Sequence, residues 1–217
     1  MNLQVALDRL TEEECDRILA SVDPSIDWIE IGTGVIKEYG MDIVRSIRKK
    51  YPDKTIVADM KTCDAGAHEA RQVFEAGADI TTVMAFAADQ TIIDMQEVAE
   101  GYGGRVMVDL LGVFSKERVA ELVALNVDLV SLHFGKDMQQ KAGMDVGMFS
   151  IVRDFPDLDV AVAGGLTLET LPDVLKHQPD TLIVGSGITK SDDPQQQAAK
   201  LKGVMTSYER DHADRRS

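Results

Sequence analysis

The chain reads TIVADMKTCDAGAHEARQVFEAGADITTVM over residues 55–84, and this stretch decides the fold. Residues 55–61 form a short apolar run of the kind found in strands that are buried on both faces. Residues 67–76 carry a helical pattern that stops at Gly77, a residue that ends helices readily. A second apolar run follows at 79–84. This order predicts two parallel strands joined by a helix.

The same unit repeats along the whole chain. Short apolar runs predict eight strands, at residues 3–8, 27–32, 55–61, 79–84, 105–110, 127–133, 159–163 and 181–185. Helical segments separate them. One is capped by Thr11, with Glu14 completing a capping box, and the last starts at Pro194 and frays in a polar tail at 209–217. Eight alternations predict an α/β protein, a closed (β/α)8 TIM barrel, with residues 1–217 as a single domain.

An open, doubly wound sheet is the rival architecture. Dinucleotide-binding sheets of that type carry Gly-x-Gly-x-x-Gly directly after the first strand, where it opens a helix. This chain has no such motif there, and its Gly101-Tyr102-Gly103-Gly104 precedes a strand. We interpret these glycines as a helix stop, and the barrel is favoured.

Composition excludes several classes of partner. The chain has 23 Lys and Arg against 37 Asp and Glu, a formal net charge of -14. Such a protein lacks the basic surface that nucleic acids and anionic membranes require. The N-terminus has no basic signal region, and no apolar run approaches the roughly 18 residues that span a bilayer. We therefore expect a cytoplasmic protein, whose two cysteines, Cys15 and Cys63, are reduced thiols.

Ionisable residues gather where the predicted strands end. They are Asp8, Glu30, Asp59, Lys61, Asp109 and His133. Reactive groups of TIM barrels lie at this end, because the loops that follow the strands form the open mouth. Asp59 and Lys61 are two residues apart and share a face of their strand, and the apolar Ile56, Ala58 and Met60 take the other face. Both charged side chains are thus predicted to point into the mouth.

Acids near the strand starts are a different group. Asp27, Asp79, Asp128 and Asp180 lie at the opposite end of the predicted barrel. We expect them to be structural or merely solvated.

Four acids at one mouth repel each other and need a cation. Lys61 supplies one positive charge. Carboxylates without a cysteine or a histidine pair favour Mg²⁺, with Mn²⁺ as an alternative, over zinc. His133 can take and return a proton at neutral pH, as proton abstraction next to a carbonyl requires.

Two glycine-rich turns follow the last two predicted strands. Loops at these places in TIM barrels frequently bind phosphate, because glycine exposes backbone N–H groups. The turns contain Gly164, Gly165, Gly185, Ser186 and Gly187. Together they predict the phosphate end of a substrate site.

Asp59-Met60-Lys61-Thr62-Cys63-Asp64-Ala65-Gly66 resembles the Asp-x-Lys-x-x-Asp signature of the orotidine-phosphate decarboxylase suprafamily. The resemblance extends through nearly the whole chain. Within the suprafamily, the stretches LQVALD (3–8), IEIGT (29–33), VDL (108–110), AVAGG (161–165) and IVGSGIT (183–189) closely resemble the 3-hexulose-6-phosphate synthase family.

This resemblance implies an aldehyde-lyase that adds formaldehyde to D-ribulose 5-phosphate through an enediolate, giving 3-hexulose 6-phosphate, and catalyses the reverse cleavage. It implies that Glu30 and Asp59 hold Mg²⁺ and that His133 moves the C1 proton. Lys61 then offers a hydrogen bond to the intermediate, while Asp8 and Asp109 position hydroxyls or water and keep Lys61 charged. By the same resemblance Asp64, which lies beyond its strand, reaches into the partner's site of a homodimer with shared active sites.

The nearest alternative is 3-keto-L-gulonate-6-phosphate decarboxylase (KGPDC) or another sugar-phosphate lyase of the suprafamily. The decarboxylase usually has Glu at the position of Asp109 and Arg at that of Ser186, which favours the synthase. The synthase, however, usually reads His-Thr-Gly where this chain has Phe134 as the middle residue, and Lys136 stands where the decarboxylase has Arg. Phe134 is large enough to change which carbonyl partner fits. A non-catalytic sugar-phosphate-binding protein is the second alternative.

Overall fold

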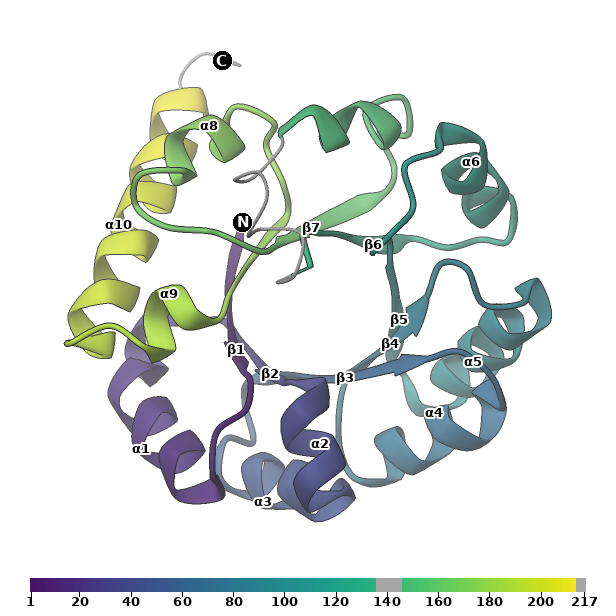
Figure 1. The fold of residues 1–217 in the computed structure, drawn as a ribbon, viewed down its shortest axis with the longest axis horizontal. Coiled ribbons are helices and arrows are strands. Elements are labelled where there is room, and N and C mark those ends of the chain that lie inside the picture. Colours follow the sequence, from purple (N-terminus) through teal and green to yellow (C-terminus); the bar gives the residue numbers. More distant parts are fainter. Residues whose placement is uncertain (136–145, 214–217) are drawn as a thin grey trace.

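Eight parallel strands close into a barrel in the computed structural model, which describes residues 1–135 and 146–213 (Figure 1). Strand β1 pairs with both β2 and β8, which closes the ring. The strands are β1 (Asn2–Leu7), β2 (Trp28–Ile31), β3 (Thr55–Thr62), β4 (Ile80–Met84), β5 (Arg105–Asp109), β6 (Leu129–His133), β7 (Asp159–Ala163) and β8 (Thr181–Val184). The predicted TIM barrel is confirmed, and each predicted strand boundary lies within two residues of the observed one.

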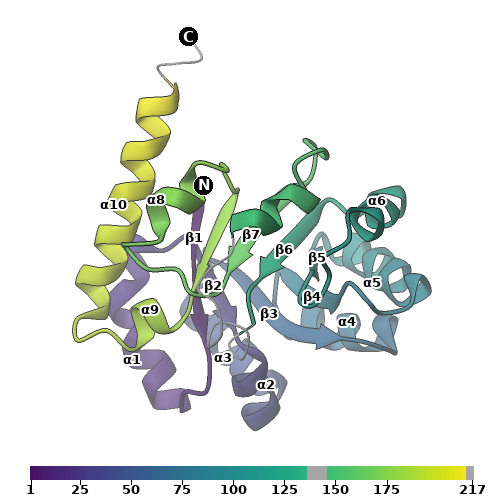
Figure 2. The same ribbon diagram turned by 45° about the horizontal axis from the view of Figure 1, so that its top comes forward.

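Helices form the outer ring around this barrel (Figures 1 and 2). They are α1 (Glu12–Val22), α2 (Thr33–Tyr39), α3 (Met41–Lys50), α4 (Gly66–Glu75), α5 (Asp89–Tyr102), α6 (Lys116–Ala124), α8 (Leu171–Leu175), α9 (Ser186–Thr189) and α10 (Pro194–Ala213), with 3₁₀ turns η1 (Asp23–Ser25) and η2 (Val146–Ile151). Within residues 1–135 and 146–213, the alternation of one strand with one helix is not uniform. The β2–β3 connection holds two helices, which meet at Gly40, and the short α9 precedes α10.

Local signals set several helix ends as expected. The Thr11–Glu14 capping box is present at the start of α1. Gly103 adopts a left-handed conformation with φ 68° and ends α5. Helix α10 begins at Pro194 and continues to Ala213, so it includes the first residues of the segment expected as a frayed tail. Residues 214–217 lie outside the described part of the chain.

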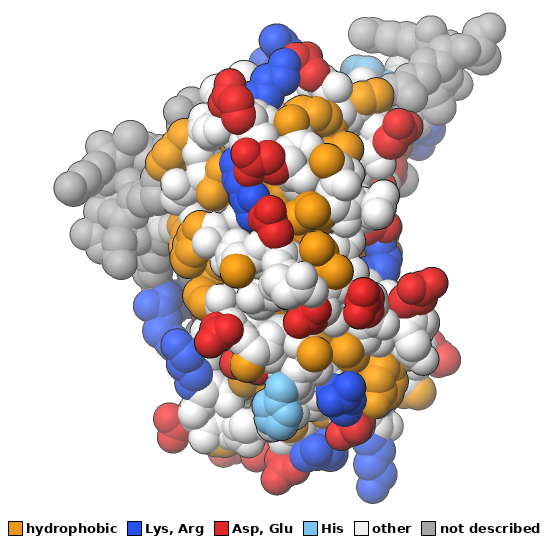
Figure 3. Space-filling view, turned by 90° about the vertical axis from the view of Figure 1, so that its right-hand side faces the viewer, with side chains coloured by type: hydrophobic (Ala, Val, Ile, Leu, Met, Phe, Trp, Pro, Cys, Tyr) orange, Lys and Arg blue, Asp and Glu red, His pale blue; other side chains and the backbone are white. Residues whose placement is uncertain are grey.

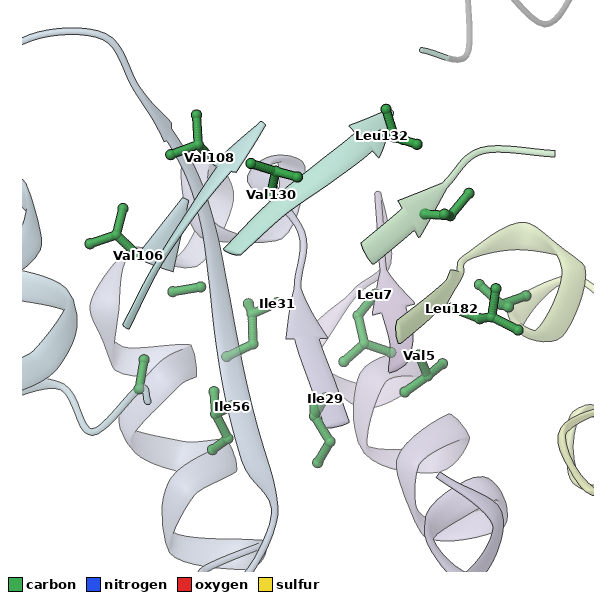
Figure 4. Close-up of a cluster of buried hydrophobic side chains, with 14 of the residues drawn as sticks. Val5, Leu7, Ile29, Ile31, Ile56, Val106, Val108, Val130, Leu132 and Leu182 are labelled. Atoms are coloured by element: carbon green, nitrogen blue, oxygen red, sulfur yellow. The ribbon is translucent and has the colours of Figure 1, made fainter. Parts of the chain in front are cut away.

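Alternation along the strands creates two apolar layers. The larger one packs between strands and helices, and Figure 4 shows its members on several strands, including Val5, Leu7, Ile29 and Ile31. Each fully buried side chain of this size contributes roughly 1.5–3 kcal/mol. The smaller layer fills the barrel itself with Ala6, Val57, Ile80, Met107, Leu129, Ala161, Ala163 and Ile183. The barrel is therefore a packed core, and the polar residues collect above it.

The acids at the amino-terminal ends of the strands are structural, as expected. Three of them accept a hydrogen bond from the backbone N–H of the second residue of a neighbouring strand. The bonds join Leu3 N to Asp27 (2.7 Å), Ile56 N to Asp79 (2.7 Å) and Val160 N to Asp180 (2.8 Å). The fourth, Asp128, forms an ion pair with Arg105 at 2.9 Å. At the end of the barrel opposite the mouth, these carboxylates thus pair with backbone N–H groups or with an arginine.

The outer surface is mixed in character. Figure 3 looks onto the side of the barrel that carries α5 and α6, where acidic and basic side chains are interspersed with small apolar areas. Within residues 1–135 and 146–213, no helix combines the length and apolar character needed to cross a membrane.

Candidate active site

A cavity of about 690 Å³ opens at the carboxyl ends of the strands. It brings together nearly all of the residues that the sequence singles out. The lining includes all six ionisable residues from the strand ends, namely Asp8, Glu30, Asp59, Lys61, Asp109 and His133. It also includes the residues of the two glycine turns, namely Gly164, Gly165, Gly185, Ser186 and Gly187. These residues come from every strand except β4 or from the turns directly after those strands, so the closure of the barrel is what makes them neighbours.

Asp64 and Phe134 are placed differently. Asp64 is exposed beyond the end of β3 and is absent from the described lining of the cavity, in keeping with its position in the sequence. Phe134 is 7% exposed and packs in the larger apolar layer. Phe134 is absent from the described lining of the cavity, whereas His133 lies in it. That its size changes which carbonyl partner fits stays a prediction. Lys136 lies outside the described residues.

Lys61 reaches the site from an irregular stretch of β3. The pairing of β3 with β4 shifts between Ala58 and Thr62, and Lys61 itself has φ 52°. Its Nζ lies 3.0 Å from Asp59 Oδ1 and 2.7 Å from Asp109 Oδ2. The predicted shared face of Asp59 and Lys61 is confirmed, and the lysine joins two carboxylates.

His133 is oriented by the same aspartate. Its Nδ1 lies 2.9 Å from Asp109 Oδ2, and Asp109 Oδ1 accepts the backbone N–H of Leu111 at 2.8 Å. An ionised carboxylate can only accept, so the proton of neutral His133 lies on Nδ1. The lone pair of Nε2 is then free to take a proton.

Asp109 and Lys61 stabilise each other's charge. Burial alone would raise the pKa of Asp109, but the hydrogen bond and charge of His133, together with Lys61, outweigh it, and the pKa is lowered. Burial alone would lower the pKa of Lys61, but the charges of Asp59 and Asp109 raise it. Both groups are therefore ionised throughout the neutral range.

Glu30 has the opposite environment. It is 8% exposed, and burial first, then the negative charges of Asp59 and Asp8, raise its pKa well above the usual value. Gln4 holds it through a hydrogen bond, in which Nε2 donates to Glu30 Oε2 at 2.6 Å. The pKa of Asp8 is also raised, by burial and by Asp59. Arg9 and Lys61 lower the pKa of Asp8, and Gln4 and Lys61 lower that of Glu30, but burial and the neighbouring acids outweigh them.

Close backbone packing fixes Asp8 beside this group. Gly32 follows β2, and a Cβ built on it would lie 2.1 Å from Asp8 Oδ1 and 2.6 Å from Leu7 O. Only glycine leaves room for the Asp8 carboxylate there. The Gly32-Thr33 turn thus belongs to the site as well as to the fold.

The donor set fits a magnesium ion. Within the described ranges, no group of three or more His, Cys, Asp or Glu side chains is arranged as a metal cluster. Glu30 and Asp59 offer two carboxylates, and Mg²⁺ is commonly held by one or two carboxylates, with water or substrate oxygens at its other positions. A divalent cation between them would also neutralise the charge that raises the pKa of Glu30.

The opposite end of the cavity carries the glycine turns. Gly164 and Gly165 have φ of 102° and 68°, which a side chain would disfavour. Ser186 and Gly187 open α9, and N–H groups at a helix start have no partner within the helix. Lys190, which the sequence analysis did not single out, lines this end too. These groups together offer an anion backbone donors and one positive charge.

Sequence reasoning also missed other polar residues that line the cavity, including Thr33, Thr82 and Gln4. Thr33 Oγ1 lies 2.8 Å from Asp59 Oδ2, Thr82 Oγ1 lies 2.8 Å from Asp59 Oδ1, and Gln4 holds Glu30. Of these three residues, Gln4 could have been singled out from the sequence, since an amide inside an apolar strand run is unusual. The two threonines are ordinary strand or helix-start residues by sequence.

Fold and site together define a TIM-barrel enzyme with a carboxylate and lysine centre at the mouth of its barrel. The chain matches the model of the Orotidine 5'-phosphate decarboxylase / HUMPS family over residues 1–201. It belongs to this family and is an enzyme of the family's lyase type. The resemblance noted in the sequence is thereby confirmed.

Individual relatives within the family are similar to this chain over nearly its whole length. The chain is 36% identical over 207 residues to 3-hexulose-6-phosphate synthase of Bacillus subtilis (strain 168), covering 94% of this chain and 99% of that protein. The crystal structure of 3-hexulose-6-phosphate synthase from Salmonella typhimurium has a TM-score of 0.93 at 33% identity, over 96% of this chain and 100% of that one. A ligand complex of KGPDC from Streptococcus mutans has a TM-score of 0.90 at 28% identity, over 95% and 98% of the two chains.

Proposed function

We propose that the protein catalyses the reversible, Mg²⁺-dependent aldol addition of formaldehyde to D-ribulose 5-phosphate, which gives 3-hexulose 6-phosphate. The observation that carries this proposal is the hydrogen bond from His133 to Asp109, which leaves Nε2 free to act as a base in a cavity that also holds Lys61. The synthase names of the relatives with 36% identity support the same reaction.

His133 performs the proton transfers in this reaction. Nε2 removes a proton from C1 of ribulose 5-phosphate, and the electron pair of the C–H bond moves into an enediolate. C1 of the enediolate then attacks the formaldehyde carbon, and the new alkoxide takes a proton. Asp109 holds the imidazole by Nδ1 throughout and stabilises its protonated form.

Lys61 stabilises the enediolate. Its ammonium group has three protons, and Asp59 and Asp109 accept two of them, so one remains for a substrate oxygen. Glu30 and Asp59 would hold Mg²⁺, which when bound supplies a double positive charge for the oxygens that become negative. Asp8 positions hydroxyls or water at the edge of this centre.

The glycine turns after β7 and β8 would bind the phosphate. Backbone N–H groups there take the place of net positive charge, which a chain of net charge -14 lacks. Lys190 adds one cation to the same wall.

Hydrogen exchange at C1 tests the proton-transfer step. We expect the protein with Mg²⁺ to exchange the C1 hydrogen of ribulose 5-phosphate for deuterium in heavy water without formaldehyde, because enediolate formation precedes addition. EDTA should stop the exchange, and so should His133→Gln. NMR of the sugar phosphate measures it. A protein that only binds the sugar phosphate would show no exchange under any of these conditions.

We also propose a homodimer in which Asp64 completes the partner's site. Asp64 is exposed and lies outside the described lining of its own chain's cavity, which supports a role in another subunit. Mixing inactive Asp59→Ala and Asp64→Ala variants should restore about a quarter of the activity, since about half of the dimers are then mixed and each has one intact site. A mixture that stays inactive after subunit exchange would count against sharing.

Decarboxylation of 3-keto-L-gulonate 6-phosphate is the second candidate, since loss of CO₂ passes through a similar enediolate. The likeness to KGPDC favours it. Ser186 and Asp109, which differ from the residues usual in that enzyme, favour the synthase reaction.

A further inference from the structure

Thr82 of β4 connects the two charged residues of β3. Its side chain is buried, and its Oγ1 accepts the backbone N–H of Lys61 at 2.9 Å and donates to Asp59 Oδ1 at 2.8 Å. A hydroxyl has one proton and two lone pairs, so it makes both bonds at once. One side chain therefore holds the backbone of the lysine and the carboxylate of the aspartate.

This contact falls where β3 leaves its regular pairing with β4. Ala58 pairs with Thr81 and Thr62 with Val83, so β3 has extra residues in this interval. Such bulges leave backbone groups without their ladder partners and redirect side chains. Lys61 has φ 52°, which residues with a side chain rarely adopt. The hydroxyl of Thr82 supplies the acceptor that the backbone N–H of Lys61 would otherwise take from a strand carbonyl.

We propose that Thr82 is a positioning residue that fixes the β3 bulge, so that Nζ of Lys61 reaches Asp59 and Asp109 together. The inference rests on the proposed function, because it assigns the bulge to the two residues used there. Among the described residues, Thr82 makes no side-chain hydrogen bond to His133 or to the glycine turns.

The neighbouring threonine provides a matched control. Thr81 is fully buried on the same strand, and its Oγ1 has no hydrogen-bond partner in the described part of the chain. Thr82→Val and Thr81→Val remove the same hydroxyl at adjacent positions while preserving shape. Thr82→Ser keeps the hydroxyl and removes only a methyl group.

We expect Thr82→Val to lower kcat by about 10- to 100-fold, the usual cost of losing a residue that orients a reactive group. KM for the sugar phosphate should stay within about threefold, since the glycine turns are untouched. Thr81→Val and Thr82→Ser should remain within about threefold of the wild-type kcat. Thr82→Ser as slow as Thr82→Val would assign the effect to packing and overturn the proposal.

Two readouts do not depend on turnover. Deuterium exchange of the Lys61 amide, followed by NMR, should be at least about tenfold faster in Thr82→Val and unchanged in Thr81→Val, because only the first loses the acceptor. Calorimetric titration with Mg²⁺ alone should show weaker binding in Thr82→Val only, since Asp59 loses a donor. Unchanged kcat and unchanged Lys61 exchange would overturn the proposal.

These readouts also separate the proposal from the proposed function. If the wild-type protein acts on neither substrate, the reaction assigned above is wrong, yet Lys61 exchange and Mg²⁺ binding still test Thr82. If Thr82→Val cannot be purified, Thr82→Ala with Thr81→Ala as its control carries the same comparison.

Discussion

We expect Lys61→Met to lower kcat at least about 1,000-fold, the upper range for losing one electrostatic stabiliser of a reaction intermediate. Methionine keeps the length of the side chain and removes its charge and its three donors. Asp59 and Asp109 then face each other without the cation that bridges them at 3.0 and 2.7 Å. The variant thus loses both the proposed hydrogen bond to the enediolate and the geometry of the two aspartates. Steady-state kinetics with saturating sugar phosphate measures the loss.

Lys54→Met is the matched control. The Lys54 side chain is 23% exposed against 25% for Lys61, and its Nζ also has several oxygen partners, the carbonyls of Asp23 and Ile26 at 2.7 and 2.6 Å. Both variants should lose stability, by roughly 1–3 kcal/mol. Only Lys61→Met should lose activity, because Lys54 is absent from the described lining of the cavity. A Lys61→Met enzyme that keeps kcat within about tenfold of wild type would contradict the role of the lysine.

Glu30→Gln should raise the stability of the metal-free protein while abolishing activity. The pKa of Glu30 in the folded protein lies above its ordinary value of 4.5 because of burial and of Asp59 and Asp8. The folded state therefore binds more protons than the unfolded state between these two pKa values, and stability falls as pH rises through that window. Glu30→Gln has no carboxylate to ionise at this position, so the stability that the wild type loses as pH rises is retained. Each 1 kcal/mol gained should raise the unfolding midpoint in EDTA by about 2–4 °C.

Magnesium gives the second readout of Glu30→Gln. A ligand at 100 times its dissociation constant stabilises the folded state by about 2.7 kcal/mol. We expect this gain for the wild type and none for Glu30→Gln, which lacks one of the two proposed metal-holding carboxylates. Asp180→Asn, which changes an acid at the other end of the barrel, should keep the gain. Equal Mg²⁺ stabilisation of the wild type and Glu30→Gln would place the ion elsewhere.

Local patterns predicted most of the fold. Strand runs and helix caps are encoded within a few residues, as the Thr11–Glu14 box and the stop at Gly103 show. The division of one helix into α2 and α3 was missed, although Gly40, with φ 63°, is a sequence signal for such a break. Gly40 lies inside a segment that has helical character on both sides, so the pattern alone does not place the turn.

The candidate site was predictable where a charge interrupts an apolar pattern. Glu30 and Asp109 stand out for that reason, and strand ends of a barrel converge on one mouth. The β3 bulge was not predictable, because it arises from pairing with β4, a partner distant in sequence. Thr82 gives no signal by itself, since threonine is common in strands. The position of Phe134 was predictable but was not predicted. His133 was expected to point into the barrel, so strand alternation places the next residue, Phe134, in the outer apolar layer, where it lies.

We propose above that this enzyme joins and splits a carbon–carbon bond to formaldehyde. The most direct measurement compares formaldehyde release from 3-hexulose 6-phosphate with CO₂ release from 3-keto-L-gulonate 6-phosphate, at equal enzyme and Mg²⁺ concentrations. We predict that formaldehyde release has the higher kcat/KM by at least about 100-fold, or roughly 2.7 kcal/mol in transition-state stabilisation. Faster release of CO₂ than of formaldehyde would contradict the account.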